Sequence, residues 1–228
     1  FNSISHEMRT PITALISASE GLLNDAVGQQ QELRRELAAE VQEAANRLDH
    51  IVQNLLAMAR FESGLIKPKL DWCDIRDVIN SSIGKMKNDL AHHPVHVDIA
   101  EPAPLMKLDF GLMEQVLLNL LRNASEYTPS GSTIRIGVQT NERECILTVT
   151  DNGPGFPAES LGKVFDKFYR VPGSKTGGLG LGLSISSGFV RAHHGNISVE
   201  NQPDGGARFT IQLPINERTT IPGEVVDG

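Results

Sequence analysis

The sequence predicts an α+β protein, in which an N-terminal helical hairpin forms a dimeric four-helix bundle and an α/β sandwich domain follows. Up to about residue 60, apolar residues recur at alternating steps of three and four, which indicates helices. After Pro68, short runs with alternating apolar residues indicate half-buried strands between helices. We therefore place the hairpin at residues 1–66, the sandwich domain at 67–216 and a loose tail at 217–228.

Two helical stretches build the predicted hairpin, with a turn at residues 24–28 between them. Two helices bury too little surface to be stable alone, so we expect a second copy to complete a four-helix bundle. The alternative is that the hairpin packs on the chain's own second domain. The two apolar seams are Phe1, Ile4, Met8, Pro11, Leu15, Ala18 and Leu22, and Leu37, Val41, Ala44, Leu48, Ile51, Leu55 and Met58.

The second domain combines strands and helices, and we expect the helices to cover one face of a sheet. The residues that alternate along half-buried strands are apolar, whereas the helical stretches show a longer apolar period. The strands are expected at residues 134–138, 145–149, 197–199 and 209–213, and the helices at 75–87, 110–126 and 181–194.

Composition narrows the function. The 28 acidic residues outnumber the 21 basic ones, and no dense Lys/Arg run occurs, so nucleic acid is not an expected partner. Cys73 and Cys145 lack metal-ligand spacing, which predicts buried, reduced thiols in a cytoplasmic compartment. No run reaches the 18 or so apolar residues that cross a bilayer, so we expect no membrane contact within this segment. Because Phe1 falls in the middle of a helical pattern, we expect a longer protein that could carry a membrane anchor upstream.

His6 is the first candidate for chemistry. If the seam residues occupy the a and d positions, His6 falls at f and faces water, with Glu7 beside it at g. A neutral imidazole can attack phosphorus, and the carboxylate can stabilise the resulting cation. Thr10, one turn further on the same face, could hold a water. The alternative is a surface histidine without a role.

The helix at 110–126 places Asn119 and Asn123 four residues apart, on a face that is not the apolar one. An asparagine oxygen suits Mg²⁺, which takes oxygen ligands and keeps phosphate oxygens and waters. These two asparagines could instead only cap loops.

Two glycine runs follow. Asp151 ends a strand and enters the run with Gly153 and Gly155, where its carboxylate could accept from an exocyclic amine such as that of adenine. The run Gly178-Leu179-Gly180-Leu181-Gly182 precedes a helix, whose exposed N–H groups can bind phosphate. Neither run is a P-loop or a dinucleotide fingerprint. Between them, we expect Phe165 and Phe168 to be core residues and the segment up to Gly177 to be a mobile lid.

Five segments in this order resemble the motifs of sensor histidine kinases of two-component systems, over residues 1 to about 215. They are His6 to Pro11, Asn119 to Tyr127, Asp151 to Gly155, Phe165 to Arg170 and Gly178 to Leu183. The resemblance implies an ATP-binding domain of the GHKL type. The stretch Asn54 to Gly64, followed by Trp72, is similar to potassium-responsive Kdp sensor kinases.

The resemblance implies roles in phosphoryl transfer at the N-terminal end. His6 would accept phosphate from ATP, Glu7 would assist, and Arg170 would reach the γ-phosphate. An aspartate of a response regulator would then receive the phosphoryl group. Thr10 would act in a phosphatase reaction on that regulator.

The resemblance also implies the nucleotide contacts. Asn123 would hold Mg²⁺ with Asn119 nearby, Tyr127 would stack on adenine, and Asp151 would read its amino group. Glu126 stands where the family often has a basic residue, and Lys167 is one cation that could replace it. The glycine runs would supply Gly153, Gly155, Gly178, Gly180, Leu181 and Gly182 to the nucleotide.

Two other functions compete with this one. The ATPases related to gyrase, Hsp90 and MutL resemble the chain in the nucleotide motifs, but they carry a water-activating Glu where Asn119 stands. The other alternative is a nucleotide-binding scaffold without catalysis, which Glu126 suggests. The intact His6, Glu7 and Asn123 favour the kinase.

Overall fold

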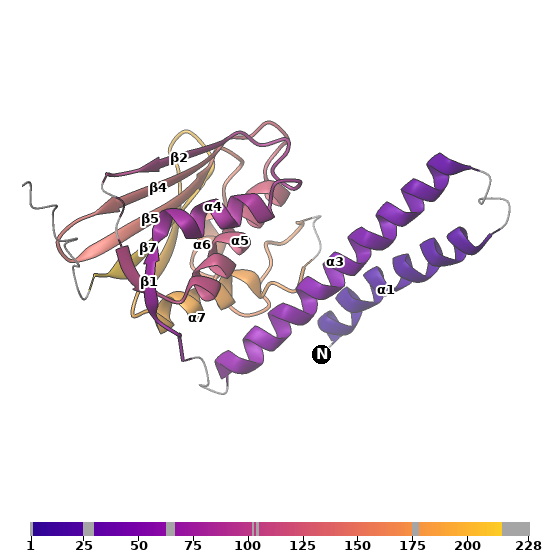
Figure 1. The fold of residues 1–228 in the computed structure, drawn as a ribbon, viewed down its shortest axis with the longest axis horizontal. Helices are drawn as coiled ribbons and strands as arrows, with labels where there is room; N and C mark the ends of the chain where they lie inside the picture. The colour runs from indigo at the N-terminus through magenta and orange to yellow at the C-terminus, as the bar shows by residue number, and fades with distance from the viewer. Residues whose placement is uncertain are drawn as a thin grey trace, which may run out of the picture. The chain divides into compact units, whose positions relative to one another are not determined.

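The computed structural model describes residues 2–24, 30–62, 67–101, 103, 105–174 and 178–215. The chain divides into two compact units (Figure 1). The first unit comprises residues 1–65 and 167–182, and the second comprises residues 66–166 and 183–228. The predicted tail at 217–228, most of the turn at 24–28 and residues 175–177 of the predicted lid lie outside the described residues.

The first unit contains the predicted helical hairpin, formed by α1 (Asn2–Leu23) and α3 (Gln31–Glu62). Its seam is the expected one, because the buried apolar residues of the two helices belong to the two predicted series, and the polar Asn54 of α3 is buried beside them. The helices pack closely at Gly21, where an added Cβ would lie 3.0 Å from Cδ1 of Leu37. The buried seam residues are Pro11, Ala18, Ala44, Ile51 and Met58.

Two described stretches of the same unit, residues 167–174 and 178–182, contact each other through their backbones. The N–H of Phe168 donates to the carbonyl of Gly180 at 3.0 Å, and a Cβ on Gly180 would collide with the carbonyl oxygen of Tyr169. Gly180 has a φ of 66°, which glycine adopts without strain. The expected core position of Phe168 is wrong: its side chain is 48% exposed and its φ is 62°, because its backbone forms the turn that meets Gly180. Phe165 is half-buried.

The second unit is built on a five-stranded sheet with the order β2-β4-β5-β7-β6. Only β2 and β4 are parallel, and the other neighbours are antiparallel. Apolar residues alternate along the four predicted strands, so one face is buried there, whereas β2 was not predicted and shows no such alternation. The strands are β2 (Val95–Ile99), β4 (Ile134–Thr140), β5 (Glu144–Asp151), β6 (Asn196–Asn201) and β7 (Ala207–Pro214).

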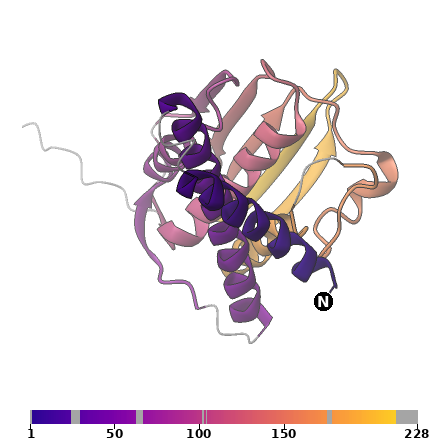
Figure 2. The same ribbon diagram turned by 90° about the vertical axis from the view of Figure 1, so that its right-hand side faces the viewer.

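Helices cover that buried face of the sheet, as Figures 1 and 2 show from two directions. α5 lies across the centre of the sheet, and its buried residues include Met113, Val116, Leu117, Leu120 and Leu121. The three expected helices are confirmed, with ends that differ by one or two residues. The helices are α4 (Ile75–Lys85), α5 (Phe110–Tyr127), the short α6 (Ala158–Leu161) and α7 (Gly182–Ala192).

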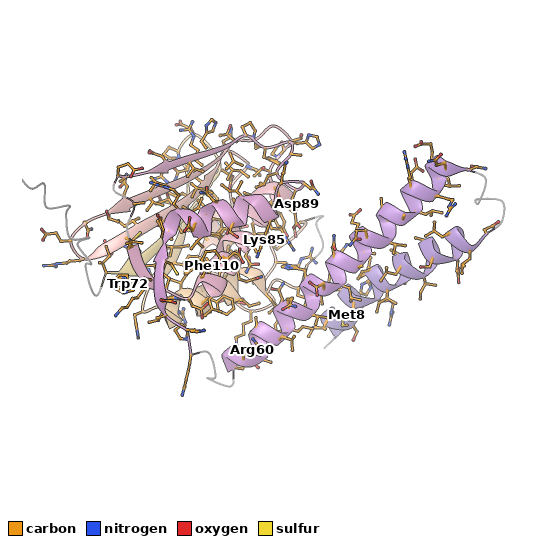
Figure 3. The ribbon with its side chains drawn as sticks, in the orientation of Figure 1. Met8, Arg60, Trp72, Lys85, Asp89 and Phe110 are labelled. Atoms are coloured by element: carbon orange, nitrogen blue, oxygen red, sulfur yellow. The ribbon has the colours of Figure 1, made fainter. Side chains whose placement is uncertain are left out.

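Polar contacts fix the helices to one another. Lys85, in the last turn of α4 (Figure 3), forms an ion pair of 2.7 Å with the largely buried Glu114 of α5. The side chain of Asp109 caps α5, while its N–H donates to Nε2 of His193 at 2.9 Å. Burial lowers the pKa of His193 and so favours the neutral imidazole, which is the form that can accept this bond.

The sequence patterns did not indicate a second, two-stranded sheet, formed by β1 (Asp71–Asp74) and β3 (Leu105–Leu108). Lys107 of β3 lies over the ring of Trp72 at 5.3 Å from the centroid, and Figure 3 shows Trp72 on β1.

Of the two free cysteines, Cys145 is buried as expected, which raises its pKa to about 12. Cys73 is only half-buried, because it lies on this small sheet.

None of the described helices combines the length and the apolar character that a membrane crossing requires.

Candidate active site

The imidazole of His6 is exposed on α1, as its predicted heptad position requires. An open groove of about 450 Å³ runs beside it along the hairpin. Thr10 lies on the same face, and its hydroxyl donates to the carbonyl of His6 at 3.4 Å. The groove is lined by His6, Arg9, Thr10, Thr13, Ala14, Ser17 and Glu40.

Glu7 lies next to this exposed histidine, but its own side chain is only 14% exposed. Nη2 of Arg47, on α3, donates to Oε2 of Glu7 at 3.2 Å. Nη1 of Arg170 donates to Oε1 at 3.4 Å. Both carboxylate oxygens are therefore engaged, and two guanidinium groups fix the carboxylate beside His6.

The two asparagines of α5 differ in their surroundings. Asn119 is 3% exposed, and its Nδ2 donates to Oγ of Ser186 on α7 at 3.1 Å. Asn123 is half-buried and has no side-chain hydrogen bond in the described part of the chain, so its amide can serve a ligand. Tyr127, one further turn along, is 42% exposed. Asn119 thus ties two helices together, while Asn123 and Tyr127 remain accessible.

The carboxylate of Asp151, at the end of β5, is held by backbone donors. The N–H groups of Gly153 and Ala207 donate to its Oδ1, at 2.9 and 3.3 Å. Within the described residues, Oδ2 has no partner, and it can accept from an amine. One oxygen thus orients the carboxylate and the other can bind a ligand.

Close packing places the carboxylate of Asp151 near the C-terminal end of α5. A Cβ on Gly153 would lie 2.5 Å from Cγ2 of Thr128, the residue that caps α5. A Cβ on Gly206 would collide with the carbonyl oxygen of Asp151, and Gly206 has a φ of 92°. Only glycine permits both approaches, so the glycine loop wraps the C-terminal end of α5.

The residues present fit a nucleotide with its metal ion. In the described ranges, no group of three or more His, Cys, Asp or Glu residues could hold a metal by itself. A single amide oxygen, that of Asn123, suits Mg²⁺ that takes its other ligands from phosphates and water. Oδ2 of Asp151 is an acceptor that suits an amine such as that of adenine.

The remaining predicted site residues lie in the first unit or at its edge. Lys167 pairs with Glu62 at 2.9 Å, and Arg170 contacts Glu7. Leu181 is buried, and the run that begins at Gly178 leads into the first turn of α7. Their contacts with a nucleotide stay a prediction. The sequence reasoning missed Arg47 and Gly206, because nothing in their local sequence indicates that they contact Glu7 and Asp151.

Comparison with known proteins identifies two domain families in the chain. Residues 1–64 match the family model of the His Kinase A (phospho-acceptor) domain. Residues 109–217 match that of the histidine kinase-, DNA gyrase B- and HSP90-like ATPase. Sensor protein KdpD of Escherichia coli is 36% identical over 215 residues, which is 93% of this chain and 24% of that protein. The similarity to Kdp sensor kinases is thus found among the relatives, and the chain spans about a quarter of their length.

Solved structures show the same architecture. The histidine kinase AdeS of Acinetobacter baumannii has a TM-score of 0.69 and 26% identity, covering 93% of this chain and 98% of that chain. The histidine kinase ThkA in complex with the response regulator protein TrrA has a TM-score of 0.67 and 20% identity, covering 93% and 60%.

A phospho-acceptor hairpin followed by an ATPase domain of this kind defines a class of ATP-dependent phosphotransferases. The chain belongs to the sensor histidine kinases.

The contact between Gly206 and Asp151 leads to a test with an internal control. We expect Gly206→Ala to cost at least about 2 kcal/mol more stability than Gly131→Ala, and to weaken ATP binding. Gly131 has a nearly equal φ of 89° but nothing within 4 Å, so its variant carries only the backbone strain, about 1 to 2 kcal/mol. Chemical denaturation and nucleotide titration of both variants measure the difference. Equal costs would contradict the proposed contact.

Proposed function

We propose that this chain is a kinase core that phosphorylates itself on His6 from MgATP and passes the phosphoryl group to an aspartate of a response regulator. The observation that carries the proposal is the exposed imidazole of His6 beside a carboxylate fixed by Arg47 and Arg170. Residues 1–66 would form the dimerisation and phosphotransfer domain, and residues 67–216 the ATP-binding domain. We place this core in the cytoplasm, where ATP is available.

The phosphoryl transfer uses an elementary displacement. A ring nitrogen of His6 forms a bond to the γ-phosphorus while the bond from phosphorus to the bridging oxygen breaks, and ADP leaves with that electron pair. The positive charge that develops on the ring is balanced by Glu7. Arg170 contacts Glu7 at 3.4 Å, which supports its proposed reach to the γ-phosphate near His6. Alignment and charge neutralisation do most of the work.

The nucleotide would lie against the ends of α5 and β5. Asp151 would accept from the adenine amine through Oδ2, and Tyr127, which is 42% exposed, would stack on the ring. Asn123 would hold Mg²⁺, which neutralises phosphate charge when bound. The glycine run Gly178 to Gly182 and Lys167 would contact the phosphates.

We also propose that two copies form the bundle. Apolar side chains remain exposed on both helices of a single hairpin. On each helix, two such residues lie four positions apart and therefore on the same face. Large apolar side chains at this spacing suit the core of a four-helix bundle. The pairs are Ile12 and Ile16 of α1, which are 40% and 54% exposed, and Val52 and Leu56 of α3, which are 38% and 50% exposed.

A response regulator would dock at the open groove beside His6, since the groove contains the phospho-acceptor itself. ThkA, which shares this fold, is known in complex with such a protein. The hydroxyl of Thr10 lies in the same groove, and we propose that it positions the water that dephosphorylates the regulator.

A plain ATPase is the less favoured function. The residue at the position of the water-activating Glu is Asn119, which is buried and bonded to Ser186. An amide cannot take the proton of an attacking water.

Replacement of His6 by Gln tests the central proposal. We expect labelling of the chain by γ-labelled ATP to fall to background, because Gln has no nucleophilic nitrogen, while ATP affinity stays within about twofold, since only phosphoryl acceptance is lost. The label on the wild-type chain should be acid-labile, as a phosphorus–nitrogen bond is. His96→Gln removes another exposed histidine and should label normally. Undiminished labelling of the His6 variant would refute the assignment.

The role of Asn123 predicts a loss that depends on magnesium. We expect Asn123→Ala to weaken MgATP binding about tenfold and to leave binding of metal-free ATP nearly unchanged, because only the metal ligand is removed. Calorimetric titration with and without Mg²⁺ separates the two effects. Gln115→Ala, on the same helix, is the control. Equal weakening in both conditions would show that Asn123 does not act through the metal.

For Thr10, we expect Thr10→Ala to keep autophosphorylation within about twofold and to lose about tenfold or more in dephosphorylation, the effect of removing a group that positions the reacting water. The substrate is a phosphorylated receiver domain that the wild-type chain dephosphorylates. Thr13→Ala alters the same groove without removing the proposed hydroxyl. A matching loss in the Thr13 variant would indicate a docking effect instead.

A further inference from the structure

Asn201, the last residue of β6, holds the far end of the glycine loop through both atoms of its amide. Its Nδ2 donates to the carbonyl of Phe156 at 2.7 Å, and its Oδ1 accepts from the N–H of Phe156 at 2.8 Å. One side chain thus satisfies both backbone groups of a loop residue 45 positions away, as a neighbouring strand would. A pair of bonds of this kind fixes orientation as well as distance.

These two hydrogen bonds between the amide of Asn201 and the backbone of Phe156 form a clasp. Gly155, the residue before Phe156, leaves room for it. Gly155 has a φ of 69°, and a Cβ at that position would lie 2.7 Å from Oδ1 of Asn201. A side chain at residue 155 would therefore displace the amide. The ring of Phe156 packs edge-on against Phe209, with centroids 6.0 Å apart, and this contact anchors the same end of the loop in the core.

The other end of the loop is held independently. Gly153 donates to Asp151, and Oδ1 of Asn152 accepts from the N–H of Thr133 at 2.7 Å. The loop between Asp151 and Phe156 is therefore pinned at both ends, and Asn201 supplies the second attachment. Fixing backbone costs about 1 to 2 kcal/mol per residue in conformational entropy, so a loop that is ordered in advance binds its ligand more tightly.

We propose that Asn201 is a positioning residue for the nucleotide, which acts by holding Gly155 and Phe156 in the shape that adenine requires. This inference rests on the proposed function of the loop as the adenine-binding segment. Asn201 is exposed, so its removal buries no unpaired polar atom and should cost little global stability. Its effect should appear in nucleotide binding and in local order.

Two variants of the full chain test the clasp. For Asn201→Ala, we expect the KM for ATP to rise about tenfold with kcat within about twofold, because ground-state and transition-state binding are lost equally. Equilibrium binding of a fluorescent ATP analogue should weaken to the same degree. Asn201→Asp keeps the shape and the acceptor, but it sets a carboxylate oxygen against the carbonyl of Phe156. It should bind no better than the alanine variant.

Amide hydrogen exchange supplies the local measurement. The N–H of Phe156 should exchange faster in both variants, while the N–H of Thr133 at the other attachment keeps its rate. Asn196→Ala is the matched control, since Asn196 begins the same strand, is exposed and has no side-chain hydrogen bond in the described part of the chain. This control should leave KM and exchange unchanged.

Several outcomes would overturn the proposal: an unchanged KM for ATP, faster exchange at Phe156 with unchanged affinity, or a general loss of thermal stability that accounts for the loss of binding. Failure of the kinase assignment is a separate result. If the His6 variant labels as the wild type does, the phospho-acceptor is wrong, whereas the effect of Asn201 on equilibrium nucleotide binding is still measured.

Discussion

The fixed carboxylate of Asp151 is the constraint on which the proposed nucleotide site depends. It ends β5, where it pairs with Ile134 of β4, and the preceding residue, Thr150, pairs with both β4 and β7. Donation from Gly153 and Ala207 to a single oxygen then sets the plane of the carboxylate. A carboxylate that is already oriented in this way loses little conformational freedom when a purine binds. Binding then requires no rearrangement of the carboxylate. Gly153 and Gly206 have no side chain, so the end of α5 can approach the loop at Gly153 and the backbone at Gly206 can approach Asp151.

A second constraint acts at the phospho-acceptor end, where one periodicity sets both stability and reactivity. The apolar seam of the hairpin buries Pro11, Ala18 and their partners on α3, and the same repeat turns His6 outward. Glu7 occupies the boundary between the two faces, so Arg47 can reach it from α3. Any shift of register that exposed Glu7 would also turn His6 away from its groove.

Much of this arrangement could be predicted because it follows local periodicity. The hairpin seam, α5 and the strands that alternate apolar residues needed only the neighbouring sequence. The contacts of Arg47 with Glu7, Asn201 with Phe156 and Ala207 with Asp151 span 40, 45 and 56 residues, and no local pattern encodes them. The four-residue strands β1 and β3 are too short for a clear period. The prediction that Phe168 lies in the core was wrong because its apolar character was taken to imply burial. Its backbone adopts a left-handed conformation that forms a turn, and its side chain is exposed.

The identity of residue 119 bears on the choice between hydrolysis and transfer. A related ATPase needs a carboxylate there to take a proton from water, but Asn119 offers only an amide, and that amide is committed to Ser186. The exposed imidazole of His6 needs no such base, since its lone pair is available in the neutral form. A site that binds ATP but lacks a base for water favours a protein nucleophile over hydrolysis. The bond between Asn119 and Ser186 thus ties α5 to α7, and in the proposed kinase residue 119 does not serve as a base for water.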